Sequence, residues 1–152
     1  MRINRSWAMP NKQTFTIKPI ADLIKEETKG KTLDPFPYPF KKDALAFMKE
    51  IESESIDTGF YDPPYSLRQL KELYEGNGIA FTQEMTQHYW SNIQEQWARL
   101  IKPGGKVIKC AWNSGRISNC FEITRILLVS HGGPHNDTIV TVQVKTSGGL
   151  FN

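Results

Sequence analysis

The pattern of apolar and polar positions predicts helices and strands that alternate along the chain. Apolar residues recur every three or four positions, as in amphipathic helices, in four segments: 20–29, 43–52, 67–74 and 86–101. Strand-like apolar runs cover four others: 56–61, 106–112, 122–130 and 138–145. The order of these elements predicts an α/β fold with a mostly parallel sheet. The loop 131–137 is short enough to join the last two strands as an antiparallel hairpin.

Composition narrows the class of protein. The chain has 152 residues, of which 39% are hydrophobic and 23% charged, which suits one packed domain over 1–152. No apolar run approaches the ~18 residues that a membrane span needs. The first residues lack the apolar stretch of a secretory signal, so we expect a cytoplasmic protein. Its two cysteines, Cys110 and Cys120, are then expected to be reduced thiols, and they lack the paired spacing of a zinc site.

Charge is unevenly distributed, although the net value is only +3. Residues 1–42 hold nine lysines and arginines against four acids, and residues 96–152 hold seven against two. Residues 43–95 hold three against ten. The two basic ends are consistent with a surface that attracts phosphate, but an ordinary solvated surface explains them as well.

The strongest chemical signal directly follows the strand predicted over 56–61. It is the tetrapeptide Asp62, Pro63, Pro64 and Tyr65. Two prolines fix the backbone and remove two N–H donors, which makes a stiff turn at the carboxyl end of a strand, where α/β folds bind ligands. The alternative is a tight structural turn whose tyrosine covers the core.

Such a turn suits methylation of an exocyclic amine. The Asp62 carboxylate and the Pro63 carbonyl can accept both hydrogens of an amino group, orient its lone pair and stabilise the charge that develops on attack. Tyr65 would stack on a planar base that has been extruded from a duplex.

These residues resemble the catalytic motif of the DNA adenine-N6 methyltransferases, especially small, phage-like members. The resemblance implies a class I methyltransferase-like (Rossmann-like) domain that transfers a methyl group from S-adenosyl-L-methionine to adenine N6 in double-stranded DNA. It also implies a bacterial, archaeal or phage-infected host cell. The segment Ile101–Lys106 is similar to the turn before the fifth strand of many such enzymes, and 131–140 is similar to the terminal hairpin of the small adenine enzymes.

The resemblance also implies cofactor-binding residues. The segment Thr14–Ile20 is similar to the motif that contacts the methionine end of the cofactor, Asp34–Phe36 to the first cofactor loop, and Asp43–Leu45 to a segment near the adenine. The residues carried over are Phe15, Ile17, Lys18, Asp34, Phe36 and Asp43.

One part of the family pattern is absent. In these enzymes the first cofactor loop leads into a helix and a second strand whose acid binds the ribose. Only residues 37–42 separate Asp34–Phe36 from Asp43, whereas a strand–helix–strand unit takes ~30 residues or more. The sheet is therefore expected to be incomplete, and the isolated chain to bind the cofactor weakly.

Several alternatives remain open. The same motif could act on RNA adenine or a protein amide, or the chain could be an inactive remnant that binds DNA or a partner. Two histidines four residues apart, His131 and His135, suggest a metal, but the glycines and proline between them favour a plain hairpin loop. We expect no metal, no membrane contact and DNA as the partner, with a homodimer as a further option.

Overall fold

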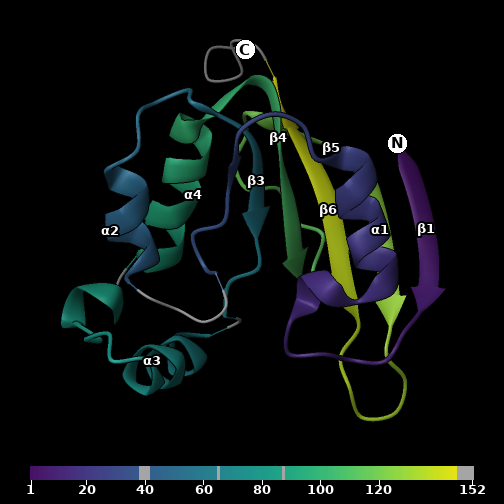
Figure 1. Cartoon of the computed structure of the whole chain (residues 1–152), viewed down its shortest axis with the longest axis horizontal. Helices are drawn as coiled ribbons and strands as arrows, with labels where there is room; N and C mark the ends of the chain where they lie inside the picture. The colour runs from purple at the N-terminus through teal and green to yellow at the C-terminus, as the bar shows by residue number, and fades with distance from the viewer. Residues whose placement is uncertain (38–41, 65, 87, 147–152) are drawn as a thin grey trace.

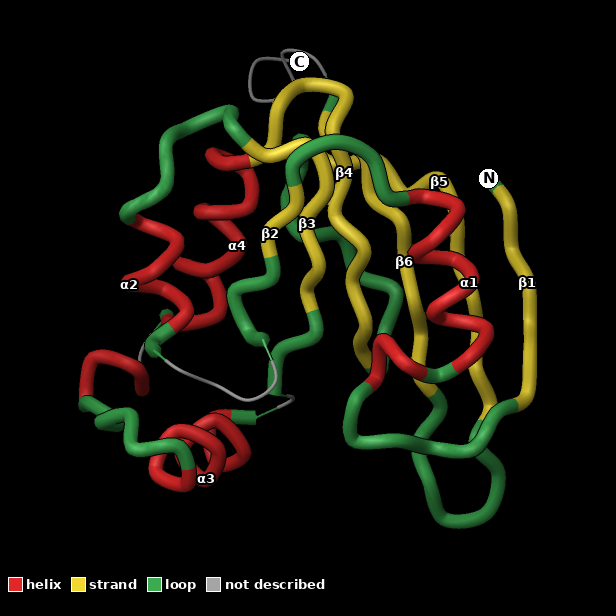
Figure 2. The backbone as a smooth tube through the Cα atoms, viewed as in Figure 1, coloured by secondary structure: helices red, strands yellow, loops and turns green. Residues whose placement is uncertain are grey.

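A six-stranded sheet forms the centre of the protein. The computed structural model describes residues 1–37, 42–64, 66–86 and 88–146. The order of the strands across the sheet is β1-β5-β6-β4-β3-β2 (Figures 1 and 2). Their bounds are Arg2–Trp7 (β1), Thr32–Leu33 (β2), Ile56–Tyr61 (β3), Ile101–Ala111 (β4), Phe121–Ser130 (β5) and Thr138–Lys145 (β6).

The sheet is mixed and mostly parallel. Strand β6 pairs antiparallel with both of its neighbours, β4 and β5, whereas β1 with β5, β2 with β3 and β3 with β4 pair in parallel. The α/β class, the mostly parallel sheet and the antiparallel hairpin at 131–137 are therefore confirmed. The arrangement is compatible with a Rossmann-like fold.

Helices cover both faces of the sheet (Figure 1). Alternate residues of β4 enter two different cores, because successive side chains of a strand point to opposite faces: Val107 packs in one, Ile108 and Cys110 in the other. The core with Ile108 also contains residues of α1, and the core with Val107 contains residues of α2, α3 and α4. The helix bounds are Thr14–Thr16 (η1, a 3-10 turn), Lys18–Glu27 (α1), Ala44–Lys49 (α2), Leu67–Gly76 (α3), Gln83–Thr86 (η2, a 3-10 turn) and Tyr89–Leu100 (α4).

A close contact between β3 and α4 fixes the strand that carries the proline motif. Gly59 lies directly beneath the Trp97 ring, and a Cβ at position 59 would overlap that ring. Trp97 is fully buried and also packs on Tyr61, with the two ring centroids 5.8 Å apart. A glycine in mid-strand here reflects the close approach of an aromatic ring.

Two helices begin at residues other than those predicted. Helix α1 starts at Lys18 and not at residue 20, because Pro19 suits the first turn of a helix, where its missing N–H costs nothing. Helix α4 starts at Tyr89 and not at residue 86, because His88 has a φ of 55°, in the left-handed region, which separates α4 from η2.

The strand after α4 starts earlier than predicted. Ile56 pairs with Ile101 and Thr58 pairs with Lys106, so residues 102–105 bulge out of the ladder. Gly104 has a φ of 82° in this bulge, which explains a glycine there. The predicted turn is thus inserted into β4 instead of preceding it.

Strand β2 lies at one edge of the sheet, next to the segment where the resemblance implies a missing unit. Only residues 34–43 separate β2 from α2, and no strand pairs with the outer side of β2 in the described part of the chain. In the described residues the sheet therefore ends where the resemblance implies a further strand.

Candidate functional site

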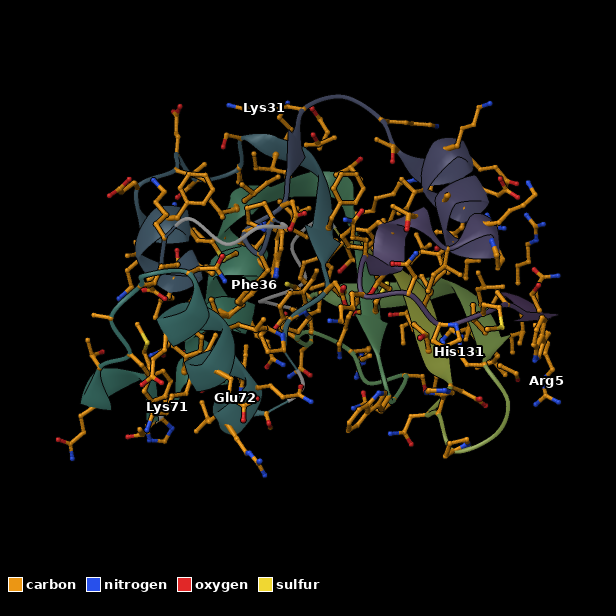
Figure 3. The ribbon with its side chains drawn as sticks, turned by 60° about the horizontal axis from the view of Figure 1, so that its bottom comes forward. Arg5, Lys31, Phe36, Lys71, Glu72 and His131 are labelled. Carbon is orange, nitrogen blue, oxygen red and sulfur yellow. The ribbon has the colours of Figure 1, made fainter. Side chains whose placement is uncertain are left out.

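The candidate site lies at the edge of the sheet where the parallel strands end. The chain leaves β2 into Asp34, β3 into Asp62 and β4 into Trp112, and these three strands are neighbours. Ligands of open α/β sheets bind outside these carboxyl ends. Figure 3 brings this edge forward and labels Phe36 and His131 on it.

The proline turn leaves β3 as a rigid, partly buried segment. Its first residue, Asp62, follows the buried Tyr61, and Pro64 is itself buried. Neither Pro63 nor Pro64 has an N–H, so this stretch presents carbonyl and carboxylate acceptors. Tyr65, for which we predicted base stacking, lies outside the described residues.

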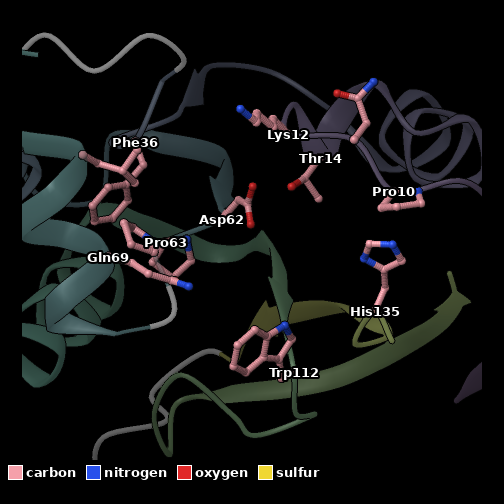
Figure 4. A pocket seen from close by; sticks show the side chains of 12 residues that line it. Pro10, Lys12, Thr14, Phe36, Asp62, Pro63, Gln69, Trp112 and His135 are labelled. Carbon is pink, nitrogen blue, oxygen red and sulfur yellow. The ribbon is translucent and has the colours of Figure 1, made fainter. Parts of the chain in front are cut away.

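Two pockets meet at Asp62. The larger, of about 770 Å³, extends from the proline turn to the loops before α1 and β6 (Figure 4). The smaller, of about 230 Å³, lies against η1 and the loop after β2. Both pockets are lined by Lys12, Thr14, Phe36 and Asp62. Their volumes fall in or near the ~300–1,000 Å³ of ligand sites, so the pair can hold two ligands with a shared wall.

Two carboxylates face the smaller pocket, those of Asp34 and Asp62. Burial raises the pKa of each to about 6. A hydrogen bond from Phe36 N to Asp34 Oδ1 (3.1 Å) lowers the pKa of Asp34 in part. For Asp62, a hydrogen bond from Thr14 lowers the pKa and the charge of Asp34 raises it.

No lysine or arginine in the described ranges forms an ion pair with Asp34 or Asp62. Burial makes the charged form of each carboxylate costly, and a positively charged ligand would compensate that cost. The smaller pocket is therefore suited to a positively charged group.

Four of the predicted site residues come together around the smaller pocket. Phe15, Asp34, Phe36 and Asp62 line it, although they lie far apart in the sequence. Phe15 packs on Phe60 of β3 with ring centroids 5.7 Å apart. The structure thus brings Phe15 and the segment Asp34–Phe36 to the proline turn.

Two other predicted cofactor residues lie beside this group. Ile17 caps α1 and is buried under it, where it lines a third pocket. Lys18 is exposed and forms a surface ion pair with Asp22, one turn along α1, at 3.2 Å. Lys18 lines none of the three pockets.

Asp43 takes part in hydrogen bonds that hold three helices together. Its carboxylate caps α2 by accepting from Ala46 N (3.0 Å), and it accepts from the hydroxyls of Tyr74 (3.0 Å) and Tyr89 (2.6 Å). Tyr74 also accepts from Ala44 N at 2.9 Å, so this network joins α2, α3 and α4. Asp43 lines none of the three pockets, and its predicted contact with a cofactor adenine stays a prediction.

The third pocket, of about 320 Å³, lies between the segment before α1 and the loop 131–137. His131 is buried below it and uses both ring nitrogens: Nδ1 lies 2.8 Å from the Ala8 carbonyl oxygen and Nε2 lies 2.7 Å from Thr138 Oγ1. His131 therefore anchors this loop. No group of three His, Cys, Asp or Glu side chains suited to a metal occurs in the described residues.

Sequence reasoning missed several pocket residues. Trp112, half exposed at the end of β4, and Gln69 on α3 both line the larger pocket, as does Lys12. A large aromatic residue directly after a buried strand was the available signal for Trp112. Gln69 and Lys12 had none, because only the tertiary fold brings their segments to the proline turn.

Comparisons with known proteins assign no family and no function to the chain. No protein-family model matches the chain, and no curated protein matches it. Among solved structures the chain is similar to one described as "Crystal Structure of PH0851", with a TM-score of 0.41 and 17% identity over 95% of this chain. The chain corresponds to 42% of that structure's length. Within the described residues, no helix is long and apolar enough to span a bilayer. Function must therefore be inferred from the geometry of the site.

Proposed function

We propose that the protein transfers a methyl group from S-adenosyl-L-methionine to the N6 amino group of adenine in DNA. The observation that carries this proposal is the position of Asp62 on the wall shared by two pockets. The larger pocket has room for an extruded base, and the smaller combines acidic groups with residues that resemble the cofactor motifs. A methyl transfer needs this arrangement, because donor and acceptor must meet at one point.

The residues of the smaller pocket fit the charged part of the cofactor. Asp34 supplies a carboxylate for its positively charged groups, and Phe15 and Phe36 supply apolar walls. When bound, the cofactor supplies an activated methyl group. The enzymes of the resembled family bind the cofactor's ribose with an acidic side chain on a second strand. In the described part of this chain the sheet ends at β2, so no such strand supplies that side chain.

The turn after β3 would act on the target amine. The Asp62 carboxylate accepts one N–H of the amine, and the Pro63 carbonyl accepts the other. Both acceptors gain strength as positive charge develops on the nitrogen, so they favour the transition state over the ground state. The ionised carboxylate is the stronger acceptor, and burial raises the pKa of Asp62 to about 6. Turnover should therefore rise with pH through about pH 6.

The test is transfer of a labelled methyl group to DNA, RNA and protein, followed by digestion of each product. We expect label in N6-methyladenine from DNA. Asp62→Ala should lower turnover by roughly 10²-fold or more, the loss typical of a preorganised transition-state contact, and should change cofactor binding far less. Asp22→Ala removes a surface carboxylate on α1 and serves as the matched control. Label in RNA or in protein amide would redirect the proposal to that substrate.

A second candidate is a remnant that binds DNA or a partner without catalysis. The edge position of β2 favours it, because nothing described beyond β2 can hold the ribose. Loss of two hydrogen bonds at about 1–3 kcal/mol each weakens cofactor binding by roughly 10- to 10⁴-fold. Calorimetric titration with millimolar S-adenosylmethionine decides: weak binding with measurable transfer supports the enzyme, and binding without transfer supports the remnant.

A further inference from the structure

The third pocket, beside the loop 131–137, shares one lining residue, Thr14, with the smaller pocket and is continuous with the larger one. It shares Trp112 and His135 with the larger pocket, and it adds Asn136 and Pro134. Figure 4 shows Trp112 between Pro63 on one side and His135 on the other. We call this third pocket the loop pocket.

The loop that builds this pocket is held firmly at its base. His131, the first residue of the loop, contacts the carbonyl of Ala8 and the hydroxyl of Thr138 through its two ring nitrogens. Gly132 has a φ of 71°, and a Cβ there would lie 3.3 Å from Trp7 Nε1, so β1 supports the loop from the other side. This anchoring leaves the side chains of His135 and Asn136 exposed at the tip.

The chemistry of the loop pocket suits a nucleobase. A side-chain amide and an imidazole recognise the donors and acceptors on base edges, and an indole provides a surface on which a base stacks. The volume of about 320 Å³ is within the ~300–1,000 Å³ of ligand sites. Lys12, at the adjacent mouth of the larger pocket, can pair with a phosphate.

We propose that the loop pocket holds the base next to the target adenine, and that His135 and Asn136 read it while Trp112 separates the two bases. This inference rests on the proposed function, since it takes the larger pocket as the site of the extruded adenine. It assigns the selection of DNA sequence to the hairpin loop 131–137.

The experiment uses the full chain and a pool of DNA duplexes that contain one fixed adenine with randomised flanking positions. Bound duplexes are separated at equilibrium and sequenced, and methylation of the same pool is measured in parallel. We expect the wild-type protein to enrich one base at a neighbouring position by about 5- to 150-fold, which corresponds to one specific base contact. His135→Ala and Asn136→Ala should remove most of this enrichment.

Asn4→Ala, on the exposed strand β1, is the matched control and should keep the full preference. Wild-type binding without any flanking preference, an unchanged preference in both loop variants, or a uniform loss of affinity for every sequence would each overturn the base-reading role. A third result separates the two proposals: the wild-type protein shows a base preference that the loop variants lose, but neither the wild type nor the variants methylate DNA. That result would refute the proposed function and leave the loop pocket as a base-binding site.

Discussion

Replacing Asp62 with asparagine should make the folded protein more stable at neutral and alkaline pH while removing the proposed function. Asparagine keeps the shape of the side chain and an oxygen that can accept the hydrogen bond from Thr14. It removes a negative charge that is partly buried and lies near the charge of Asp34. The expected gain follows from the raised pKa of Asp62.

The direction in which stability changes with pH depends on whether the folded or the unfolded state binds the Asp62 proton more tightly. An unfolded aspartate ionises near its ordinary pKa of 3.8, whereas burial raises the pKa of Asp62 in the folded protein to about 6. Between these values the folded state holds a proton that the unfolded state has lost, so stability falls as pH rises through this window. Above about pH 6 the full loss is present, at most roughly 3 kcal/mol for a pKa difference of this size. Residual exposure to water reduces this, and we expect about 1–3 kcal/mol.

Urea denaturation of wild type and Asp62→Asn near pH 8 and near pH 4 measures the effect. The variant should be more stable near pH 8, and the gain should nearly vanish near pH 4, where the wild-type carboxyl is also neutral in the folded state. Asp22→Asn removes the same charge from an exposed pair and should change stability by under about 1 kcal/mol at either pH. An equal gain at both pH values, or no gain near pH 8, would show that Asp62 does not carry a buried charge in the folded state.

Three further substitutions test the packing that positions the site. Gly59→Ala should destabilise the fold by at least about 1–3 kcal/mol, because the new methyl group overlaps the Trp97 ring. Its control, Gly76→Ala, has open space around the new methyl group and should not lower the melting temperature. Asp43→Ala should cost about 2–4 kcal/mol in urea denaturation, since it removes a helix cap and leaves two tyrosine hydroxyls with one acceptor fewer. Arg99→Ala should lower the free energy of unfolding by about 1–3 kcal/mol in the same assay, because its guanidinium donates to the carbonyl of Met48 in α2 and to that of Ile51 just after it, each at 2.8 Å. Unchanged stability would mean that water replaces the guanidinium.

Elements whose stability comes from local pattern were predictable from the sequence. The bounds of β3 and β6 agree with those predicted, because apolar runs ended by turn residues define both. Strand β1 was not predicted, because nearly all its residues are exposed and its strand conformation comes from pairing with β5, more than a hundred residues away. Strand β2 has only two residues, too few for any periodicity.

In the candidate site, too, features set by local sequence were predictable and features set by distant partners were not. Two prolines after a strand indicate a rigid turn from their own geometry, so Asp62 and its neighbours could be located in advance. The environment of Asp43 could not, because its tyrosine partners are 31 and 46 residues further along the chain. For His131, the carbonyl that holds one ring nitrogen is 123 residues away. The hydrogen-bond partners of such side chains lie far away in the sequence, so they cannot be predicted before the fold is known.

The order of the strands explains why a hairpin loop can reach the candidate site at all. Strand β6 inserts between β4 and β5 and runs opposite to β4, so it begins at the edge where β4 ends. The loop 131–137, which precedes β6, is therefore placed beside Trp112, which follows β4. The strand–helix–strand unit that the resemblance implies would lie on the other side, beyond β2, at the far end of the same edge. In the proposed function, cofactor binding and base selection depend on opposite sides of the proline turn, so the absence of a strand–helix–strand unit would weaken the first without altering the geometry of the second.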